Sequence, residues 1–167
     1  VGVVATLTEG FKPSIVAKTT RVLSERLAPA GARIAVETRV AHRAEEVAAA
    51  LREIAAQSDL VVIFGASAIA DRRDVIPAGL ERAGGDVLRL GMPVDPGNLL
   101  MLGRLGDLPV LGAPGCARSP AENGFDWVLR RLLAGLPVSG DDIRRMGVGG
   151  LLSEIATRPQ PREGHES

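Results

Sequence analysis

Residues 59–85, DLVVIFGASAIADRRDVIPAGLERAGG, decide the fold class of this chain. The segment opens with a nearly continuous apolar run, which is typical of a central β-strand covered on both faces. A loop of small and charged residues follows. Asp74 then stands where it can cap a helix, Pro77 is tolerated in the first turn of that helix, and Gly84 and Gly85 end it. A buried strand, a loop and a helix in this order indicate an α/β unit.

The segments on both sides repeat this alternation. Strand-like runs are VGVVATL (1–7) and ARIAVET (32–38) before the quoted stretch and DVLRLGM (86–92) after it. Apolar residues at helical spacing predict two helices between the first three strands. The residues that mark them are Ile15, Thr19, Val22, Leu23 and Leu27, and then Val47, Ala50, Leu51 and Ile54. Strands that alternate with helices predict a three-layer α/β/α domain with a mostly parallel sheet.

The last third of the chain predicts a hairpin and further helices. The runs LLMLGRL (99–105) and LPVLGAP (108–114) flank a Gly-Asp pair, which is typical of two neighbouring strands. A helix is predicted to begin at Ser119, with Pro120 at the first helical position and Glu122 in capping-box position. Its buried residues would be Phe125, Val128, Leu129, Leu132 and Leu133.

We expect one domain over residues 1–157. Within it, residues 139–157 would add a short helix and an apolar tail that packs on the sheet edge. Residues 158–167 are polar and contain proline, which predicts a tail or linker. The strand pattern begins at Val1 without a methionine, so we also expect further chain before it.

Composition limits the function classes. Lys plus Arg equals Asp plus Glu at 20 each, so no net charge draws the chain to nucleic acid or to an anionic membrane. Aromatic residues are 2% of the chain and include no tyrosine, which argues against stacking on single-stranded nucleic acid. Cys116 is the single cysteine, and no apolar stretch approaches the roughly 20 residues that span a bilayer. We therefore expect a soluble cytoplasmic protein that binds neither nucleic acid nor membrane.

Two loops are the candidate ligand site, because ligands of open α/β sheets bind beyond the carboxyl ends of the strands. Loops 65–74 and 112–120 both leave predicted strands and lead to helix N-termini, which attract anions such as phosphate. In the second loop, Gly115 would let the backbone approach a ligand, and Arg118 and Ser119 would donate hydrogen bonds. An ordinary strand-to-helix turn is the simpler interpretation of this glycine pattern.

Charged and nucleophilic side chains in these loops allow more than one interpretation. Asp71 and Asp74 could hold Mg²⁺ against a phosphate, or Asp74 could be a plain N-cap and Asp71 a solvated charge. Arg72 and Arg73 could pair with phosphate or with these aspartates. Cys116 precedes a helix, a setting that lowers the pKa of a thiol, although a small loop residue is the simpler interpretation.

Three motifs in order resemble a known family. They are RRDVIPAGLERAGGDV (72–87), DPGN (95–98) and GRLGDLPVLGAPG (103–115) with the helix that follows. From about Val3 to Gly135 the chain is similar to the molybdopterin-binding domain family of molybdenum cofactor biosynthesis, which includes molybdopterin adenylyltransferases and molybdopterin molybdotransferases. The resemblance implies a three-layer fold that binds the phosphate and dithiolene end of the pyranopterin at the carboxyl ends of the strands.

The resemblance also supplies site residues. Asp74 matches the family's functional aspartate, which is associated with Mg²⁺ and with nucleotidyl or molybdate chemistry, so Asp74 is the expected catalytic and metal-binding residue. The residues expected to line the pterin site are Gly65, Ser67, Arg73, Asp95, Gly97, Asn98, Pro114, Gly115, Cys116, Arg118 and Ser119.

The chain departs from the family pattern in the first loop, where added methyl groups impede close backbone approach, and at an acidic position. GASA (65–68) replaces the usual Gly-Gly-Thr-Gly or Gly-Gly-Val-Ser, and Ala41 and His42 stand where the family has another acidic position. Loss of an acidic partner weakens metal-assisted catalysis more than ligand binding. We therefore expect a domain that binds molybdopterin or molybdenum cofactor within a larger biosynthesis or maturation protein. The alternatives are an active Mg²⁺-dependent adenylyltransferase or molybdotransferase, in which His42 or Glu9 replaces the missing acid, and a non-catalytic oligomerisation module.

The resemblance extends to partners. GASAIADRRDVIPAG (65–79) and PGCARSPAENGFDW (114–127) are similar to bacterial proteins in which such a domain precedes a nucleotidyltransferase domain of the molybdenum cofactor cytidylyltransferase type. This implies the same linkage here, with a pterin as the small-molecule partner. Because family members often form dimers or trimers, it also implies a homo-oligomer.

Overall fold

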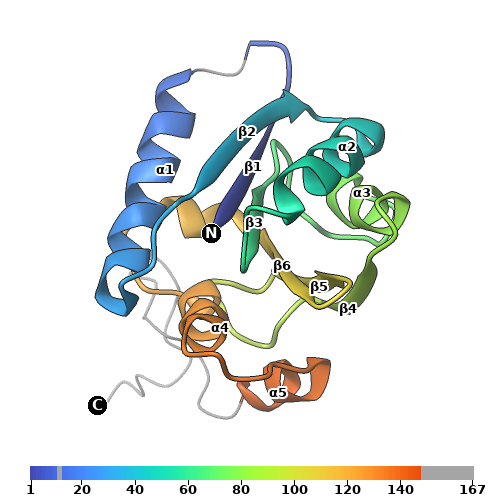
Figure 1. Cartoon of the computed structure of the whole chain (residues 1–167). Helices are drawn as coiled ribbons and strands as arrows, with labels where there is room; N and C mark the ends of the chain where they lie inside the picture. Colours follow the sequence, from blue (N-terminus) through green and yellow to red (C-terminus); the bar gives the residue numbers. More distant parts are fainter. Residues whose placement is uncertain (11–12, 148–167) are drawn as a thin grey trace, which may run out of the picture.

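A six-stranded sheet forms the centre of the molecule, in the order β2-β1-β3-β6-β5-β4 (Figure 1). The structure is a computed structural model that describes residues 1–10 and 13–147. Strands β2, β1, β3 and β6 run parallel, whereas β5 runs antiparallel to both of its neighbours. The predicted class, α/β with a mostly parallel sheet, is confirmed. The strands are β1 (Gly2–Leu7), β2 (Val36–Ala41), β3 (Val61–Phe64), β4 (Asp86–Leu90), β5 (Met101–Leu105) and β6 (Leu108–Ala113).

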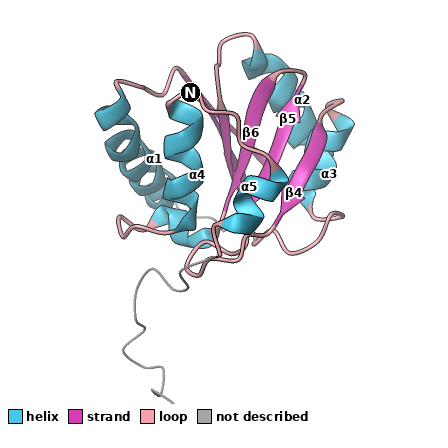
Figure 2. Ribbon diagram, turned by 90° about the horizontal axis from the view of Figure 1, so that it is seen from below, coloured by secondary structure: helices cyan, strands magenta, loops and turns pink. Residues whose placement is uncertain are grey.

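Helices cover both faces of the sheet. Helices α1, α4 and α5 contribute to the core on one face, and α2 and α3 to the core on the other, so the domain has three layers (Figure 2). None of the described helices is long and apolar enough to cross a membrane. The helices are α1 (Pro13–Leu27), α2 (Ala44–Ala55), α3 (Val75–Arg82), α4 (Gly124–Leu133) and α5 (Gly140–Arg145), with single 3₁₀ turns η1 (Ala28–Ala30) and η2 (Gly115–Arg118).

Strand β3 is the centre of both cores, as its apolar run predicts. Its side chains alternate between the faces: Val62 and Phe64 pack with α1 and α4, whereas Val61 and Ile63 pack with α2 and α3. All four are at most 2% exposed. Burial of both faces explains why the run contains no polar residue.

Strand β2 and helix α1 differ from the prediction in detail. The second strand occupies 36–41 rather than 32–38, because its register on β1 begins with Val36 opposite Gly2 and residues 32–35 lead to it from the η1 turn. In α1, Ile15 is 39% exposed and its neighbour Val16 is buried in its place. The other predicted positions of the two helices, from Thr19 to Ile54, are buried.

The first helical residue of α4 is Gly124, four residues later than the predicted Pro120. Asn123, and not Ser119, is the N-cap: its side chain accepts a hydrogen bond from Phe125 N, and Asp126 completes the capping box. Residues 119–121 stay outside the helix because Arg26 binds the carbonyl groups of Ser119 and Ala121. Phe125, Val128 and Leu129 are buried, as predicted, and Leu132 and Leu133 are partly buried.

The C-terminal part contains the predicted hairpin and short helix. Strands β5 and β6 pair antiparallel across the Gly106-Asp107 turn. Helix α5 supplies Ile143 to the core beside α4. Residues 148–157 of the expected domain, and the whole expected tail 158–167, lie outside the described residues.

Candidate functional site

Three loops meet at the edge of the sheet where the parallel strands end. They follow β3 (65–74), join β4 to β5 (91–100) and follow β6 (114–123). Arg118 connects two of them, because its guanidinium donates hydrogen bonds to the Gly65 carbonyl at 2.8 Å and to Thr19 Oγ1 at 2.9 Å. The same guanidinium lies 5.4 Å from the centre of the Phe64 ring. Arg118 therefore joins the loop after β6 to the loop after β3 and to α1.

The loop after β3 folds around its own side chains. A Cβ atom on Gly65 would lie 2.8 Å from the Ser67 carbonyl oxygen, so the glycine is required by the loop itself. Asp74 is the N-cap of α3, as predicted, but its carboxylate points back into the loop. Asp74 Oδ2 accepts hydrogen bonds from the backbone N–H groups of Ala70 at 2.7 Å and Asp71 at 2.8 Å. The carboxylate thus occupies the place that an external anion would take at these two donors.

Asp71 and Arg73 pair with each other, which was one of the two interpretations of these charges. Asp71 Oδ1 accepts hydrogen bonds from the backbone N–H of Arg73 at 2.8 Å and from its Nε at 3.0 Å. These bonds, the backbone one first, lower the pKa of the Asp71 carboxyl. The Arg73 side chain is 92% exposed, so its guanidinium is accessible to a ligand. A ligand would compete only with the weak surface ion pair to Asp71.

The loop after β6 contains a single 3₁₀ turn, and Pro114 is its buried N-cap. Cys116 in this turn is half-buried, and burial raises the pKa of its thiol. This direction favours the simpler interpretation of Cys116 as a small loop residue over an activated thiol, because a four-residue turn offers little dipole to offset the loss of water. Gly115 is exposed, and a Cβ atom there would meet nothing within 4 Å.

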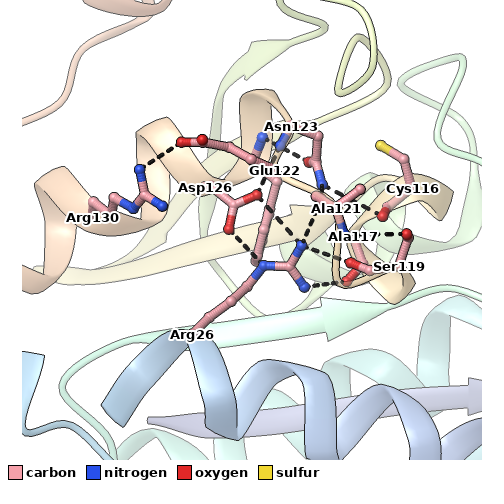
Figure 3. A network of polar contacts seen from close by, with 10 residues as sticks. Arg26, Cys116, Ala117, Ser119, Ala121, Glu122, Asn123, Asp126 and Arg130 are labelled. Carbon is pink, nitrogen blue, oxygen red and sulfur yellow. Dashed lines mark hydrogen bonds and ion pairs between the residues drawn. The ribbon is translucent and has the colours of Figure 1, made fainter. Parts of the chain in front are cut away.

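Arg26 of α1 fixes the back of this loop, and sequence reasoning missed it. Its Nε lies 2.5 Å from Asp126 Oδ1, and its two terminal nitrogens donate to the carbonyl groups of Ala117 and Ser119 (Figure 3). Only 9% of the Arg26 side chain and 6% of the Asp126 side chain are exposed. The one signal in the sequence is the position of Arg26 between two core leucines of α1.

The DPGN motif (95–98) lies at the start of α4. The Pro96 carbonyl accepts a hydrogen bond from Gly124 N at 2.8 Å, and a Cβ atom on Gly97 would lie 2.6 Å from that nitrogen. Gly97 is buried and has a φ of 126°, which L side chains rarely adopt, so the backbone of the loop requires a glycine here. Asp95 is close enough to Cys116 to raise the thiol pKa further, and Asn98 is exposed.

A chain of three side chains connects β1 to the loop after β3. Thr6 Oγ1 lies 2.7 Å from His42 Nδ1, and His42 Nε2 lies 2.9 Å from Ser67 Oγ. Asp74 is near enough to act on His42 electrostatically. Sequence reasoning named Ser67 and His42 separately but not Thr6, whose only signal is that it interrupts the apolar run of β1.

The structure thus places the predicted residues in two groups along one edge. Ser67 and Asp74 lie around His42, and Cys116 lies beside Asp95, with Arg118 and Gly65 between the two loops. Ser119 faces away from this arrangement: its carbonyl binds Arg26, and its Oγ accepts a hydrogen bond from Ala121 N.

A family model described as "Probable molybdopterin binding domain" matches residues 2–135, which include all six strands and these three loops. The chain belongs to the molybdopterin-binding domain family. No match to a curated protein is found.

Two solved structures are similar to this chain at low sequence identity. The molybdopterin biosynthesis MoeA protein of Pyrococcus horikosii is 19% identical with a TM-score of 0.52, and the match covers 85% of this chain and 34% of that one. A molybdenum cofactor biosynthesis protein from Pyrococcus furiosus is 18% identical with a TM-score of 0.47, with 81% and 38% covered. The domain spans about a third of the length of these archaeal proteins.

The described part of the molybdopterin-binding domain has few side chains placed to bind a metal ion. Within residues 1–10 and 13–147, no group of three or more His, Cys, Asp or Glu side chains is placed to hold one. Asp74 has one oxygen committed to two backbone hydrogen bonds. A Mg²⁺ ion would therefore fit here only if oxygen atoms of a bound ligand completed its coordination shell.

The molybdopterin-binding domain also has a cavity of about 610 Å³, whose lining includes Pro120 and Glu122 of the loop after β6. It lies between the end of α1 and α4 and includes Arg26, Pro120, Leu133 and Ala134. Among its charged lining residues, Arg26 pairs with Asp126 and Arg130 with Glu122 (Figure 3), and Glu25 pairs with Arg21. The cavity thus borders the loop after β6, but its lining includes neither Gly115 nor Cys116 of that loop.

Proposed function

We propose that this domain binds molybdopterin or molybdenum cofactor at the strand-end loops, as one domain of a protein that makes or matures that cofactor. The observation that carries the proposal is the convergence of loops 65–74, 91–100 and 114–123, the first and last joined by Arg118, within the stretch that matches the molybdopterin-binding family. Ligands of open α/β sheets bind at this edge.

The groups at the edge suit the two ends of the pterin ligand. The exposed guanidinium of Arg73 and the hydroxyl of Ser67 are donors for a phosphate. Cys116 suits the dithiolene end of the ligand. Because burial raises the pKa of its thiol, the thiol stays neutral at physiological pH and does not repel an anionic dithiolene. The exposed Gly115 leaves room for the ligand to approach the turn.

Asp74 is proposed as the residue that would bind Mg²⁺ together with ligand oxygens. Such an ion would neutralise phosphate charge, and Asp74 would orient it from the start of α3. Binding without transfer is the simpler proposal, because His42 stands where a second carboxylate would be needed and makes a hydrogen bond to Ser67. Formation of an adenylylated or molybdenum-loaded product by the domain would establish the active transferase instead.

The test is a titration of the purified domain with molybdopterin, with and without Mg²⁺, followed by the fluorescence of Trp127. Arg73→Ala is expected to weaken binding about tenfold through loss of one charged hydrogen bond. Arg104→Ala is the matched control: Arg104 is also an exposed arginine in an ion pair, but it pairs with Asp86 at the opposite edge of the sheet. Asp74→Asn keeps an acceptor for the loop and is expected to remove only the effect of Mg²⁺. Absence of binding by the wild type would refute the proposal.

We further infer that the domain works in the cytoplasm beside a nucleotidyltransferase domain and as a homo-oligomer. The resemblance of residues 65–79 and 114–127 to such two-domain proteins supports the linkage. Sedimentation analysis of the domain would test the oligomer, and the reading frame around it would test the linkage. A monomer at high concentration, or a frame without the transferase domain, would contradict the respective inference.

A further inference from the structure

The chain Thr6–His42–Ser67 joins three elements at the ligand edge. Thr6 belongs to β1, His42 lies between β2 and α2, and Ser67 lies in the loop after β3. Ser67 is exposed, His42 is half-buried and Thr6 is 1% exposed, so the chain runs from the core to the surface. The resemblance to the molybdopterin-binding family assigns no role to Thr6 and an acid to the position of His42.

The hydrogen atom of the Thr6 hydroxyl fixes the tautomer of His42. Thr6 Oγ1 accepts a hydrogen bond from Ala66 N at 2.8 Å. In the described part of the chain, the acceptor within reach of the Thr6 hydroxyl hydrogen is His42 Nδ1 at 2.7 Å. If Nδ1 carried the hydrogen instead, both neighbours of Thr6 Oγ1 would be donors, and a buried hydroxyl hydrogen would be left without an acceptor. Thr6 therefore donates and Nδ1 accepts.

The orientation of Ser67 follows from this tautomer. A neutral imidazole that accepts at Nδ1 carries its hydrogen on Nε2, so Nε2–H donates to Ser67 Oγ at 2.9 Å. Ser67 Oγ is thereby an acceptor toward His42, and its own hydrogen is available to a second partner. Burial lowers the pKa of His42, which favours the neutral ring, while the Asp74 carboxylate acts in the opposite direction.

We propose that His42, held by Thr6, orients Ser67 as a hydrogen-bond donor to an oxygen atom of the bound pterin ligand, with its phosphate as the strongest acceptor. His42 is then a positioning residue, and Thr6 is the residue that sets its tautomer. The identity of the ligand rests on the proposed function, whereas the tautomer does not.

The same tautomer means that His42 cannot activate Ser67 as a nucleophile. In a Ser-His-Asp triad a carboxylate accepts the hydrogen of Nδ1, which leaves Nε2 free to take a proton from serine. Here a hydroxyl donates to Nδ1, so Nε2 already carries a hydrogen and cannot accept one from Ser67. The nearby Asp74 carboxylate is turned to the N–H groups of Ala70 and Asp71.

The tautomer can be read from the nitrogen chemical shifts of His42. Long-range ¹H–¹⁵N correlation spectra of the full chain near neutral pH are expected to show Nε2 protonated and Nδ1 unprotonated. The chain has two histidines, so His42→Asn identifies the signals. Thr6→Val is expected to abolish the preference, and Thr6→Ser to preserve it. A protonated Nδ1 in the wild type would overturn the proposal, and so would an unchanged tautomer in Thr6→Val; if that variant does not fold, the wild-type spectrum decides.

The role of Ser67 is tested by molybdopterin titration. Ser67→Ala is expected to bind about tenfold more weakly than the wild type, and His42→Asn to weaken binding less, because Ser67 keeps its donor but loses its fixed direction. Ser24→Ala is the control, since Ser24 is an exposed serine whose hydroxyl donates to the Thr20 carbonyl of its own helix. Wild-type affinity in Ser67→Ala would contradict the proposal. Failure of the wild type to bind molybdopterin would refute the proposed function and with it the pterin as the partner of Ser67, whereas the nitrogen shifts would still decide the tautomer and the direction of the His42–Ser67 hydrogen bond.

Discussion

The thiol of Cys116 gives a residue-scale prediction. Burial raises its pKa, so the thiolate fraction at about pH 7.5 is smaller than for an unhindered thiol. We expect iodoacetamide to alkylate Cys116 several-fold more slowly in the folded domain than in the urea-unfolded chain. Mass spectrometry follows the reaction without ambiguity, because Cys116 is the single cysteine. Equal or faster alkylation of the folded domain would instead indicate an activated thiol.

His42 predicts how stability depends on pH. Burial lowers the pKa of His42 in the fold, partly opposed by Asp74. The pKa of histidine in the unfolded chain is about 6.5. Below that pH the unfolded chain therefore binds more protons than the folded domain, and the fold loses stability. The free energy of unfolding should therefore fall more steeply from about pH 7 to 5 in the wild type than in His42→Asn. Urea titrations measure both slopes, and since the carboxylates are the same in both proteins, parallel slopes would contradict the prediction.

Residue roles were predictable from sequence only where position alone decides them. Asp74 stands at the N-cap of α3 as predicted, but the direction of its carboxylate depends on where the loop brings the N–H groups of Ala70 and Asp71. Arg118 was expected to face a ligand and also bonds to Gly65, a partner 53 residues away. Such long-range partners leave no periodic signal in the sequence.

At the scale of elements, the caps of α4 and α5 offer a matched comparison. Asn123 and Ser139 both form capping boxes, but Asn123 is 1% exposed and its amide also donates to the Ala121 carbonyl at 3.0 Å. We expect Asn123→Ala to lower the free energy of unfolding by about 2 kcal/mol or more, and Ser139→Ala by about 1 kcal/mol.

Urea denaturation with a common slope for all variants measures this difference. Asn123→Asp is an informative control, because it keeps the acceptor for Phe125 N but removes the amide donor and adds charge beside Asp126. Equal losses in Asn123→Ala and Ser139→Ala would show that the extra hydrogen bonds of Asn123 add nothing to stability.

Element identity was predictable, and boundaries were less so. The apolar spacing of α2 and the continuous run of β3 decide those elements locally, and both were predicted correctly. The start of α4 was not predicted correctly, because Arg26 of α1 donates hydrogen bonds to the carbonyl groups of Ser119 and Ala121, which a helix would use for its own backbone hydrogen bonds. A contact across the fold therefore outweighed a plausible local capping pattern.

At the scale of the whole molecule, the topology decides where a ligand can meet several loops. Alternating strands and helices predicted a mostly parallel sheet, and parallel strands bring their carboxyl ends to one edge. The strand order was not predictable, since it depends on which strands pair. The cavity between α1 and α4 was not predictable either, because it is formed by helix packing around Arg26 and Asp126.

The strand-end loops and the cavity between α1 and α4 give a prediction about the whole domain. Gly115 is exposed at the strand-end loops with open space at its Cβ position, and Ala134 is exposed at the rim of the cavity. Gly115→Trp and Ala134→Trp therefore each add one large side chain to one place without disturbing the core. We expect Gly115→Trp to weaken molybdopterin binding by about tenfold or more, because a bulky ring blocks the approach to the loop. Ala134→Trp is expected to leave the affinity unchanged. Thermal unfolding of both variants controls for the fold. The reverse result, with binding lost only in Ala134→Trp, would move the ligand site to the cavity between α1 and α4.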